Sequence, residues 1–75
     1  MYPRIRHMRE DKDLAQADLA KVLHMTQSGY SRYEIGKNDI PTQVLKTLAI
    51  FHNTSVDYLL ELTDNPEPYE RKKIK

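Results

Sequence analysis

Residues 16–34, QADLAKVLHMTQSGYSRYE, constrain the fold of this chain more than any other stretch. Apolar side chains recur there at i, i+1 and i+4 and then at i and i+3, a spacing typical of two short amphipathic helices. The apolar set is Leu19, Ala20, Leu23, Met25, Tyr30 and Tyr33, and the polar row beside it is Gln27, Ser28, Ser31 and Arg32. The pattern predicts two helices joined by a tight turn, each with one buried stripe and one exposed stripe.

The turn between these helices must reverse the chain within three or four residues, which usually places one residue in the left-handed region. This chain has His24 there, where a residue with a β-carbon loses about 1 kcal/mol relative to glycine. We interpret His24 as a structural turn residue rather than as a pH sensor or metal ligand. Thr26 is the expected N-cap of the second helix, about 27–35, and Gly36 its stop. Gly29 inside that helix has two explanations, close approach of a ligand to the backbone or simple tolerance.

Three further helices are predicted around this pair. The first covers about 3–11, where Ile5 and Met8 face the core and Pro3 suits the first turn. The next begins after Thr42 as N-cap and buries Val44, Leu45, Leu48, Ala49 and either Phe51 or His52. Asn53 is expected in the left-handed conformation, and Ser55 caps a last helix, about 56–62. The fold class is therefore all-α, a compact bundle of five helices.

Composition excludes several classes of protein. Seventy-five residues make at most one domain, and the chain has no apolar run long enough for a membrane span or signal peptide. With no cysteine, and with histidines only at 7, 24 and 52, no metal site is expected. The chain has no glycine-rich phosphate loop or catalytic carboxylate pair, so we expect neither an enzyme nor a cofactor or small-molecule ligand. A soluble, cytoplasmic protein is expected.

Charge is balanced over most of the chain. Residues 1–63 hold eight Lys/Arg and eight Asp/Glu, and residues 64–75 hold four and three, for a net charge of +1. We predict a folded domain over 1–63 and a charged tail over 64–75. The tail is interpreted as flexible; a helix completed in an oligomer and a basic arm on phosphates are the alternatives. A nucleic-acid partner would have to be held by shaped local contacts rather than by overall charge.

The order of residues over about 4–62 resembles the phage-repressor and Cro type helix-turn-helix family. The resemblance is carried by Arg9, Gln16, Leu19, Ala20, Leu23, Thr26, Gln27, Ser28, Tyr33, Glu34, Gly36, Lys37, Pro41, Thr42, Leu45, Leu48, Ala49 and the run NTSVDYLL at 53–60. It implies a lambda-repressor-like fold that binds double-stranded DNA, with the helix at 27–35 in the major groove. Two departures are His24, where the family usually has glycine, and the tyrosines at 30 and 33, where it usually has aliphatic residues.

The resemblance also implies roles for individual residues. Base contacts are expected from Gln27, Ser28 and Arg32, since glutamine can pair with adenine and arginine with guanine. Contacts to the DNA backbone are expected from Gln16, Thr26, Ser31, Lys37 and Asn38. Arg9 and Glu34 are expected to form a structural pair between the first and third helices.

The predicted function is transcriptional regulation, as a repressor, by a homodimer on a near-palindromic operator with half-sites about one helical turn apart. Tyr58 and Leu62, which lie off the apolar stripe of the last helix, are candidates for the dimer surface. The alternative is a protein-interaction module on the same fold, such as an antitoxin or antirepressor, which the neutral charge of residues 1–63 mildly favours. The polar row at 27–32 favours DNA, because protein contacts prefer apolar and aromatic anchors.

Overall fold

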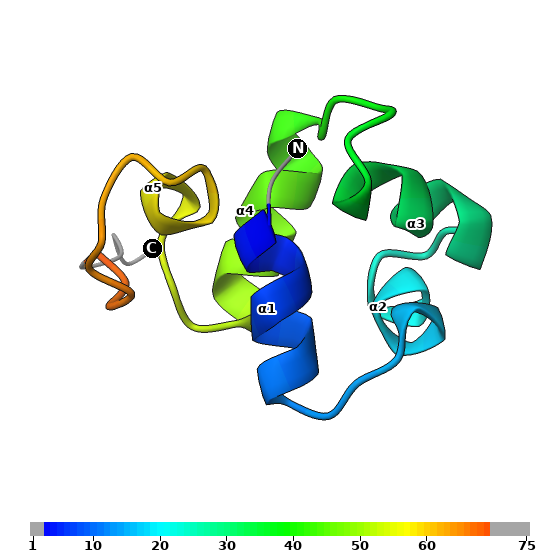
Figure 1. The fold of residues 1–75 in the computed structure, drawn as a ribbon, viewed down its shortest axis with the longest axis horizontal. Coiled ribbons are helices and arrows are strands. Elements are labelled where there is room, and N and C mark those ends of the chain that lie inside the picture. The colour runs from blue at the N-terminus through cyan, green and yellow to red at the C-terminus, as the bar shows by residue number, and fades with distance from the viewer. Residues whose placement is uncertain (1–2, 70–75) are drawn as a thin grey trace, which may run out of the picture.

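Five helices follow one another over residues 3–69, the part of the chain that the computed structural model describes. They are α1 (Pro3–Asp11), α2 (Gln16–Val22), α3 (Gln27–Glu34), α4 (Thr42–Phe51) and α5 (Val56–Leu59). Figure 1 shows α2 and α3 together on one flank, α5 on the opposite flank, and α1 and α4 between them. The described residues contain no strand, so the predicted all-α fold of five helices is confirmed.

Three of the helices, α2, α3 and α5, begin where a side chain can satisfy a free backbone N–H group. The Thr26 hydroxyl accepts from the Gly29 N–H at 3.1 Å, and the Ser55 hydroxyl accepts from the Tyr58 N–H at 3.0 Å, as predicted for both caps. At the start of α2 the Asp18 carboxylate accepts from the Ala15 N–H at 2.8 Å. These bonds explain why short helices with few apolar residues start at defined positions.

Two predicted helix limits are wrong. Thr42 is the first residue of α4 rather than its N-cap, because the Pro41 carbonyl already accepts the first helical bond, from the Leu45 N–H at 3.0 Å. The last helix ends at Leu59 rather than at residue 62. Glu61 takes a φ of 63° there, and the Leu62 N–H returns to the Asp57 carbonyl at 2.8 Å, so the chain leaves the helix early.

All five helices end with the same hydrogen-bonding pattern. The residue two positions beyond the helix has positive φ, and the N–H after it bonds to a carbonyl five positions back, which is the Schellman motif. The residues with positive φ are Asp13 (56°), His24 (55°), Gly36 (82°), Asn53 (53°) and Glu61 (63°). The predicted left-handed conformations of His24 and Asn53 are confirmed, and Gly36, with a φ of 82°, follows the end of α3 as predicted. Asp13 and Glu61 were not predicted.

The core lies where the helices converge on α1 and α4. Its buried members are Ile5, Leu19, Ala20, Tyr30, Ile40, Leu48, Ala49 and Leu59, with Met8, Leu14, Leu23, Met25, Tyr33, Val44, Leu45, Phe51 and Val56 packed partly buried around them. Of the two residues proposed for the end of the α4 stripe, His52 is buried and Phe51 half-buried. The core is small because the whole domain is small, with a radius of gyration of 12.1 Å.

The segment after α5 lies against the helices. The Arg4 guanidinium donates to the carbonyls of Tyr58 and Thr63 and to the Asp64 carboxylate, the last at 3.1 Å. The Thr54 hydroxyl donates to the Pro66 carbonyl, so residues 64–66 are tied to the fold.

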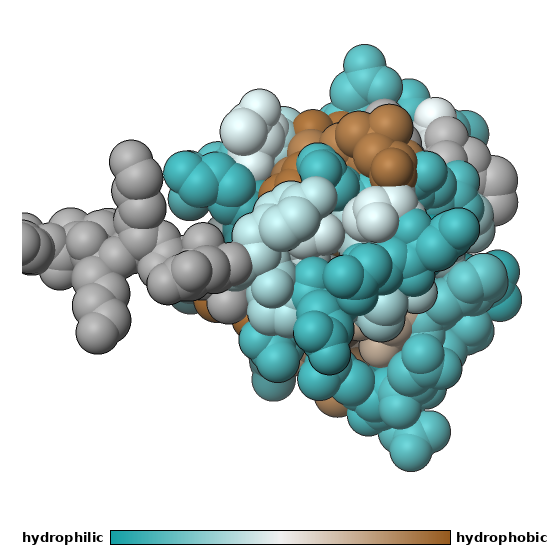
Figure 2. Space-filling view, turned by 90° about the vertical axis from the view of Figure 1, so that its left-hand side faces the viewer, coloured by the Kyte–Doolittle hydropathy of each residue, from teal (hydrophilic) through white to brown (hydrophobic). Residues whose placement is uncertain are grey.

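The same contacts bear on the predicted tail. The Tyr69 hydroxyl donates to the Asp57 carboxylate at 2.8 Å, which fixes residue 69 beside α5. The domain boundary after residue 63 stays a prediction, and residues 70–75 of the predicted tail lie outside the described residues. Seen from the α5 flank, the surface is largely hydrophilic, with one larger apolar area near the top of the view and smaller ones at its lower edge (Figure 2). Within residues 3–69, no helix is long and apolar enough to span a membrane.

Candidate nucleic-acid interface

The outer face of α3 is polar and open to solvent. Gln27, Ser28 and Arg32 are exposed and Ser31 is half-buried, whereas Tyr30 and Glu34 on the opposite side are buried. This division follows from the helical repeat, since residues three and four positions apart share a face. The structure therefore brings the three predicted base-contacting residues onto one exposed surface of one helix.

The start of α3 is crowded around its cap. A β-carbon at Gly29 would lie 3.0 Å from the Met25 Cε and 3.1 Å from the Thr26 Oγ1. The Thr26 hydroxyl is held there because it accepts the Gly29 N–H, and it lies 3.5 Å from the Ser28 hydroxyl. Crowding within the chain is thus a reason for glycine at position 29 that neither of the two sequence-based explanations had included.

A buried ion pair holds the other side of α3. Arg9 Nε lies 2.8 Å from Glu34 Oε2, and Arg9 Nη2 lies 3.1 Å from Glu34 Oε1, so the pair is bidentate. Their side chains are only 11% and 2% exposed. Arg9 Nη1 also donates to the Leu14 carbonyl at 2.7 Å, and Gln16 Nε2 donates to Glu34 Oε1 at 3.1 Å. The Glu34 carboxylate therefore links α1 and the first residue of α2 to the end of α3, and Arg9 extends the network to the loop after α1.

The charged state of this network follows from its contacts. Burial alone would raise the pKa of Glu34, but hydrogen bonds from Arg9 and Gln16 and the charge of Arg9 hold the pKa below its ordinary value. The hydrogen bond to Glu34 raises the pKa of Arg9. Burial, with the nearby Glu34 carboxylate, raises the pKa of Tyr30. Glu34 is thus a carboxylate and Tyr30 a neutral phenol at neutral pH.

Four of the five residues expected to contact the DNA backbone lie at three places: the loop after α3, the start of α3 and the start of α2. Lys37 and Asn38 are exposed in the loop after α3, and Thr26 is exposed at its start. Gln16 is the first residue of α2, and its side-chain amide has one donor turned inward to Glu34. Since an amide group has a second donor and an acceptor, this contact leaves Gln16 able to meet a phosphate.

The two residues predicted for the dimer surface differ in exposure, and the surface itself stays a prediction. Leu62 is 73% exposed, but Tyr58 is half-buried rather than exposed. The Arg4 guanidinium lies 4.1 Å from the centre of the Tyr58 ring and covers it. The sequence offered no signal for this role of Arg4, because its partners are 54–60 positions away in the chain.

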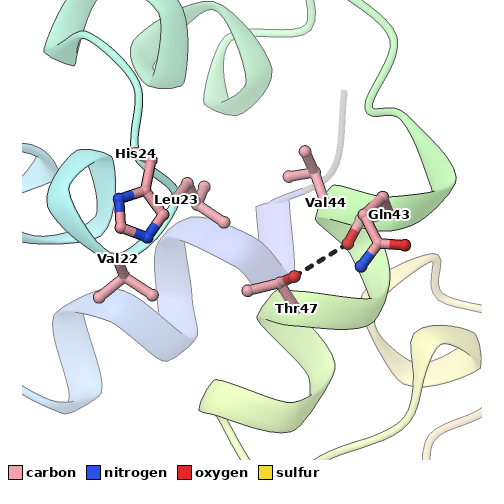
Figure 3. Close-up of a pocket in the computed structure, with 6 residues that line it drawn as sticks. All are labelled: Val22, Leu23, His24, Gln43, Val44 and Thr47. Carbon is pink, nitrogen blue, oxygen red and sulfur yellow. Dashed lines mark hydrogen bonds between the residues drawn. The ribbon is translucent and has the colours of Figure 1, made fainter.

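A hollow of about 390 Å³ lies between the end of α2 and the first turns of α4 (Figure 3). It is lined by Val22, Leu23, His24, Gln43, Val44 and Thr47, and the Thr47 hydroxyl donates to the Gln43 carbonyl at 3.0 Å. None of the residues predicted to contact DNA lines it, so the hollow and the α3 face are separate features.

Comparison with known proteins agrees with this geometry. The family model described as "Helix-turn-helix" matches residues 5–59. Two curated relatives are from Bacillus subtilis: "Uncharacterized HTH-type transcriptional regulator YobD" is 38% identical over 73 residues, and "SPbeta prophage-derived uncharacterized HTH-type transcriptional regulator YonR" is 35% identical over 60 residues. These alignments cover 96% and 80% of this chain, but only 65% and 56% of the relatives. The search of solved structures found no significant match. The chain belongs to the helix-turn-helix family, and α2 and α3 lie within the matched residues.

Proposed function

We propose that this protein binds double-stranded DNA sequence-specifically, with α3 in the major groove, and that it regulates transcription as a repressor. The observation that carries the proposal is the exposed polar face of α3, backed by a face that is fixed by burial and by the Arg9–Glu34 pair. The major groove admits one α-helix, and base edges there present distinguishable patterns of donors and acceptors. A rigid helix with polar side chains on its outer face is suited to that surface.

Individual roles follow from the position of each side chain. Gln27, Ser28 and Arg32 contact base edges, because they are exposed on α3. Phosphate contacts come from Gln16, Thr26, Ser31, Lys37 and Asn38, which surround that face at the start of α2, the start and flank of α3, and the loop after it. These contacts set the position of the helix and carry no sequence information themselves.

The binding form is a homodimer on a near-palindromic operator in the cytoplasm, with half-sites about one helical turn, roughly 34 Å, apart. One unit of this size contacts too few base pairs to select a genomic site alone. The exposed Leu62, in the segment after α5, supports a dimer surface on the flank opposite α2 and α3 (Figure 1). That arrangement leaves both copies of α3 free for DNA.

The decisive experiment is selection of binding sites from a pool of random duplexes by the full chain. Recovery of a near-palindromic sequence is expected, and it would establish DNA binding and two-fold symmetry together. Failure to enrich any sequence would overturn the proposal and favour the alternative of a protein-interaction module, such as an antitoxin or antirepressor.

Arg32→Ala tests base reading on the recovered duplex. Loss of the arginine contact should weaken binding by about 1–3 kcal/mol and relax selectivity at one base position. Lys46→Ala removes an exposed positive charge from α4 and is the matched control, expected to bind as the unmodified protein does. An equal loss on all sequences for Arg32→Ala would mean that Arg32 neutralises phosphate and does not read a base.

A further inference from the structure

An isoleucine lies at the C-terminal end of the polar face of α3. Ile35 is 54% exposed, one of four large hydrophobic side chains exposed among the described residues. The others, Ile50, Leu62 and Tyr69, lie in α4 or after α5. Ile35 is thus the one large apolar group that the described α3 region presents to solvent.

The backbone of Ile35 continues the helix. Its φ of −87° and ψ of −3° are right-handed, and its N–H bonds to the Ser31 carbonyl at 3.1 Å. At about 100° per residue, Ile35 is turned by only about 20° from Ser28 and about 60° from Arg32 around the helix axis. It therefore lies near the centre of the face that carries the predicted base contacts, and not at its edge.

The chemistry of the groove suggests what such a side chain would meet. In the major groove, base edges present donors, acceptors and a single apolar group, the 5-methyl of thymine. Along the helix axis Ile35 lies about 10 Å beyond Ser28, a distance longer than the roughly 3.4 Å spacing of successive bases on one DNA strand. A base read by Ile35 would therefore be distinct from the bases read at the start of the helix.

We propose that Ile35 is a specificity-determining residue that contacts the 5-methyl group of a thymine at one end of each half-site. This inference rests on the proposed function, since it assumes that α3 enters the major groove. Burial of the exposed isoleucine against a methyl group gives favourable apolar contact that a cytosine or guanine at the same position cannot provide. Selectivity at that position then comes from an apolar contact rather than from a hydrogen bond.

Replacement of single thymines by deoxyuridine tests the proposal, because it removes only the methyl group. The probe is the duplex recovered by selection, with each thymine replaced in turn, symmetrically in both half-sites. Binding by the unmodified protein should weaken at one symmetric pair of positions by about fourfold per methyl. Ile35→Ala should bind the unmodified duplex more weakly by a similar factor and should be insensitive to deoxyuridine at that pair.

Ile50→Ala is the matched control, because Ile50 is also an exposed isoleucine, 62% exposed, but lies on α4. It should keep the full affinity and the full sensitivity to deoxyuridine. The inference is overturned if no thymine replacement weakens binding, or if Ile35→Ala keeps the sensitivity of the unmodified protein; in both cases DNA binding itself stands. If the selection recovers no duplex, the proposed function fails, and the inference fails with it.

Discussion

His52 is a buried histidine without hydrogen bonds. It is 4% exposed, and neither ring nitrogen has a partner among the described residues. The Phe51 ring meets it edge-on, with centroids 5.1 Å apart, and the Lys12 ammonium lies 5.8 Å from the Phe51 ring centre. Burial, with the charge of Lys12, lowers the pKa of His52 from 6.5 to about 4. The folded protein therefore holds this imidazole neutral.

This gives a pH dependence with a definite sign. The pKa of His52 is lower in the folded chain than in the unfolded chain. The contribution of His52 to the free energy of unfolding is therefore fully present above about pH 6.5 and is lost as the pH falls towards 4. The free energy of unfolding should drop by about 2 kcal/mol between pH 7 and pH 5. Urea denaturation at the two pH values measures this change.

His52→Gln should remove most of that difference, whatever its effect on stability at pH 7. His7→Gln, at an exposed histidine on α1, is the control and should keep the pH dependence of the unmodified protein. A His52→Gln variant that loses as much stability on acidification as the parent would show that another group titrates.

The five described helices all end in a Schellman motif, although the residue that takes the positive φ differs from one helix to the next. Of the five residues with positive φ at helix ends, only Gly36 is a glycine. The other four have a β-carbon, and the left-handed conformation costs each of them about 1 kcal/mol of stability. They are Asp13, His24, Asn53 and Glu61. Asparagine, aspartate and histidine are enriched in this region among residues other than glycine, so Glu61 is the least suited of the four to it.

His24→Gly should leave the thermal midpoint unchanged or raise it, because glycine adopts φ near 55° without strain. The corresponding gain in the free energy of unfolding is at most about 1 kcal/mol. The gain is limited by the greater freedom of glycine in the unfolded chain. Gly36→Ala, at φ 82°, is the converse variant and should destabilise the protein. Calorimetry measures the thermal midpoint of each variant. A clearly lower midpoint for His24→Gly would reveal a stabilising contact of the imidazole.

The packing of the whole domain depends on one carboxylate. Glu34 accepts from Arg9 and Gln16, so it connects α1 and α2 to α3. In Glu34→Gln the buried guanidinium of Arg9 loses its counter-charge, and the free energy of unfolding should fall by about 3 kcal/mol. That is a large part of the stability of a small domain, and chemical denaturation measures it.

A solvent-exposed pair on α1 serves as the control. Arg6 Nε lies 3.2 Å from Glu10 Oε2, and the two side chains are 60% and 47% exposed. Glu10→Gln should therefore change stability by less than about 0.5 kcal/mol. Equal effects of the two glutamate substitutions would contradict the role assigned to burial.

Sequence patterns predicted the features that depend on local spacing. The five helices, the caps at Thr26 and Ser55 and the buried and exposed faces of α3 all follow from residues three or four positions apart. The contacts of Arg4 and the covered ring of Tyr58 depend on residues far apart in the chain, which no local pattern encodes. The early end of α5 follows from the positive φ of Glu61, which the apolar spacing over 56–62 does not indicate. Local spacing likewise gives no signal for the proposed role of Ile35, which stands at the end of the helix predicted over 27–35. The individual DNA contacts stay predictions.

The contacts of Arg4 have a consequence for the order in which the domain folds. They join residues 54–60 positions apart, so they can form only after the intervening helices have come together. Contacts that are absent from the transition state affect the rate of unfolding and leave the rate of folding nearly unchanged. Arg4→Ala should therefore speed unfolding in stopped-flow experiments with little effect on refolding, which makes this one side chain a determinant of how long the folded domain persists.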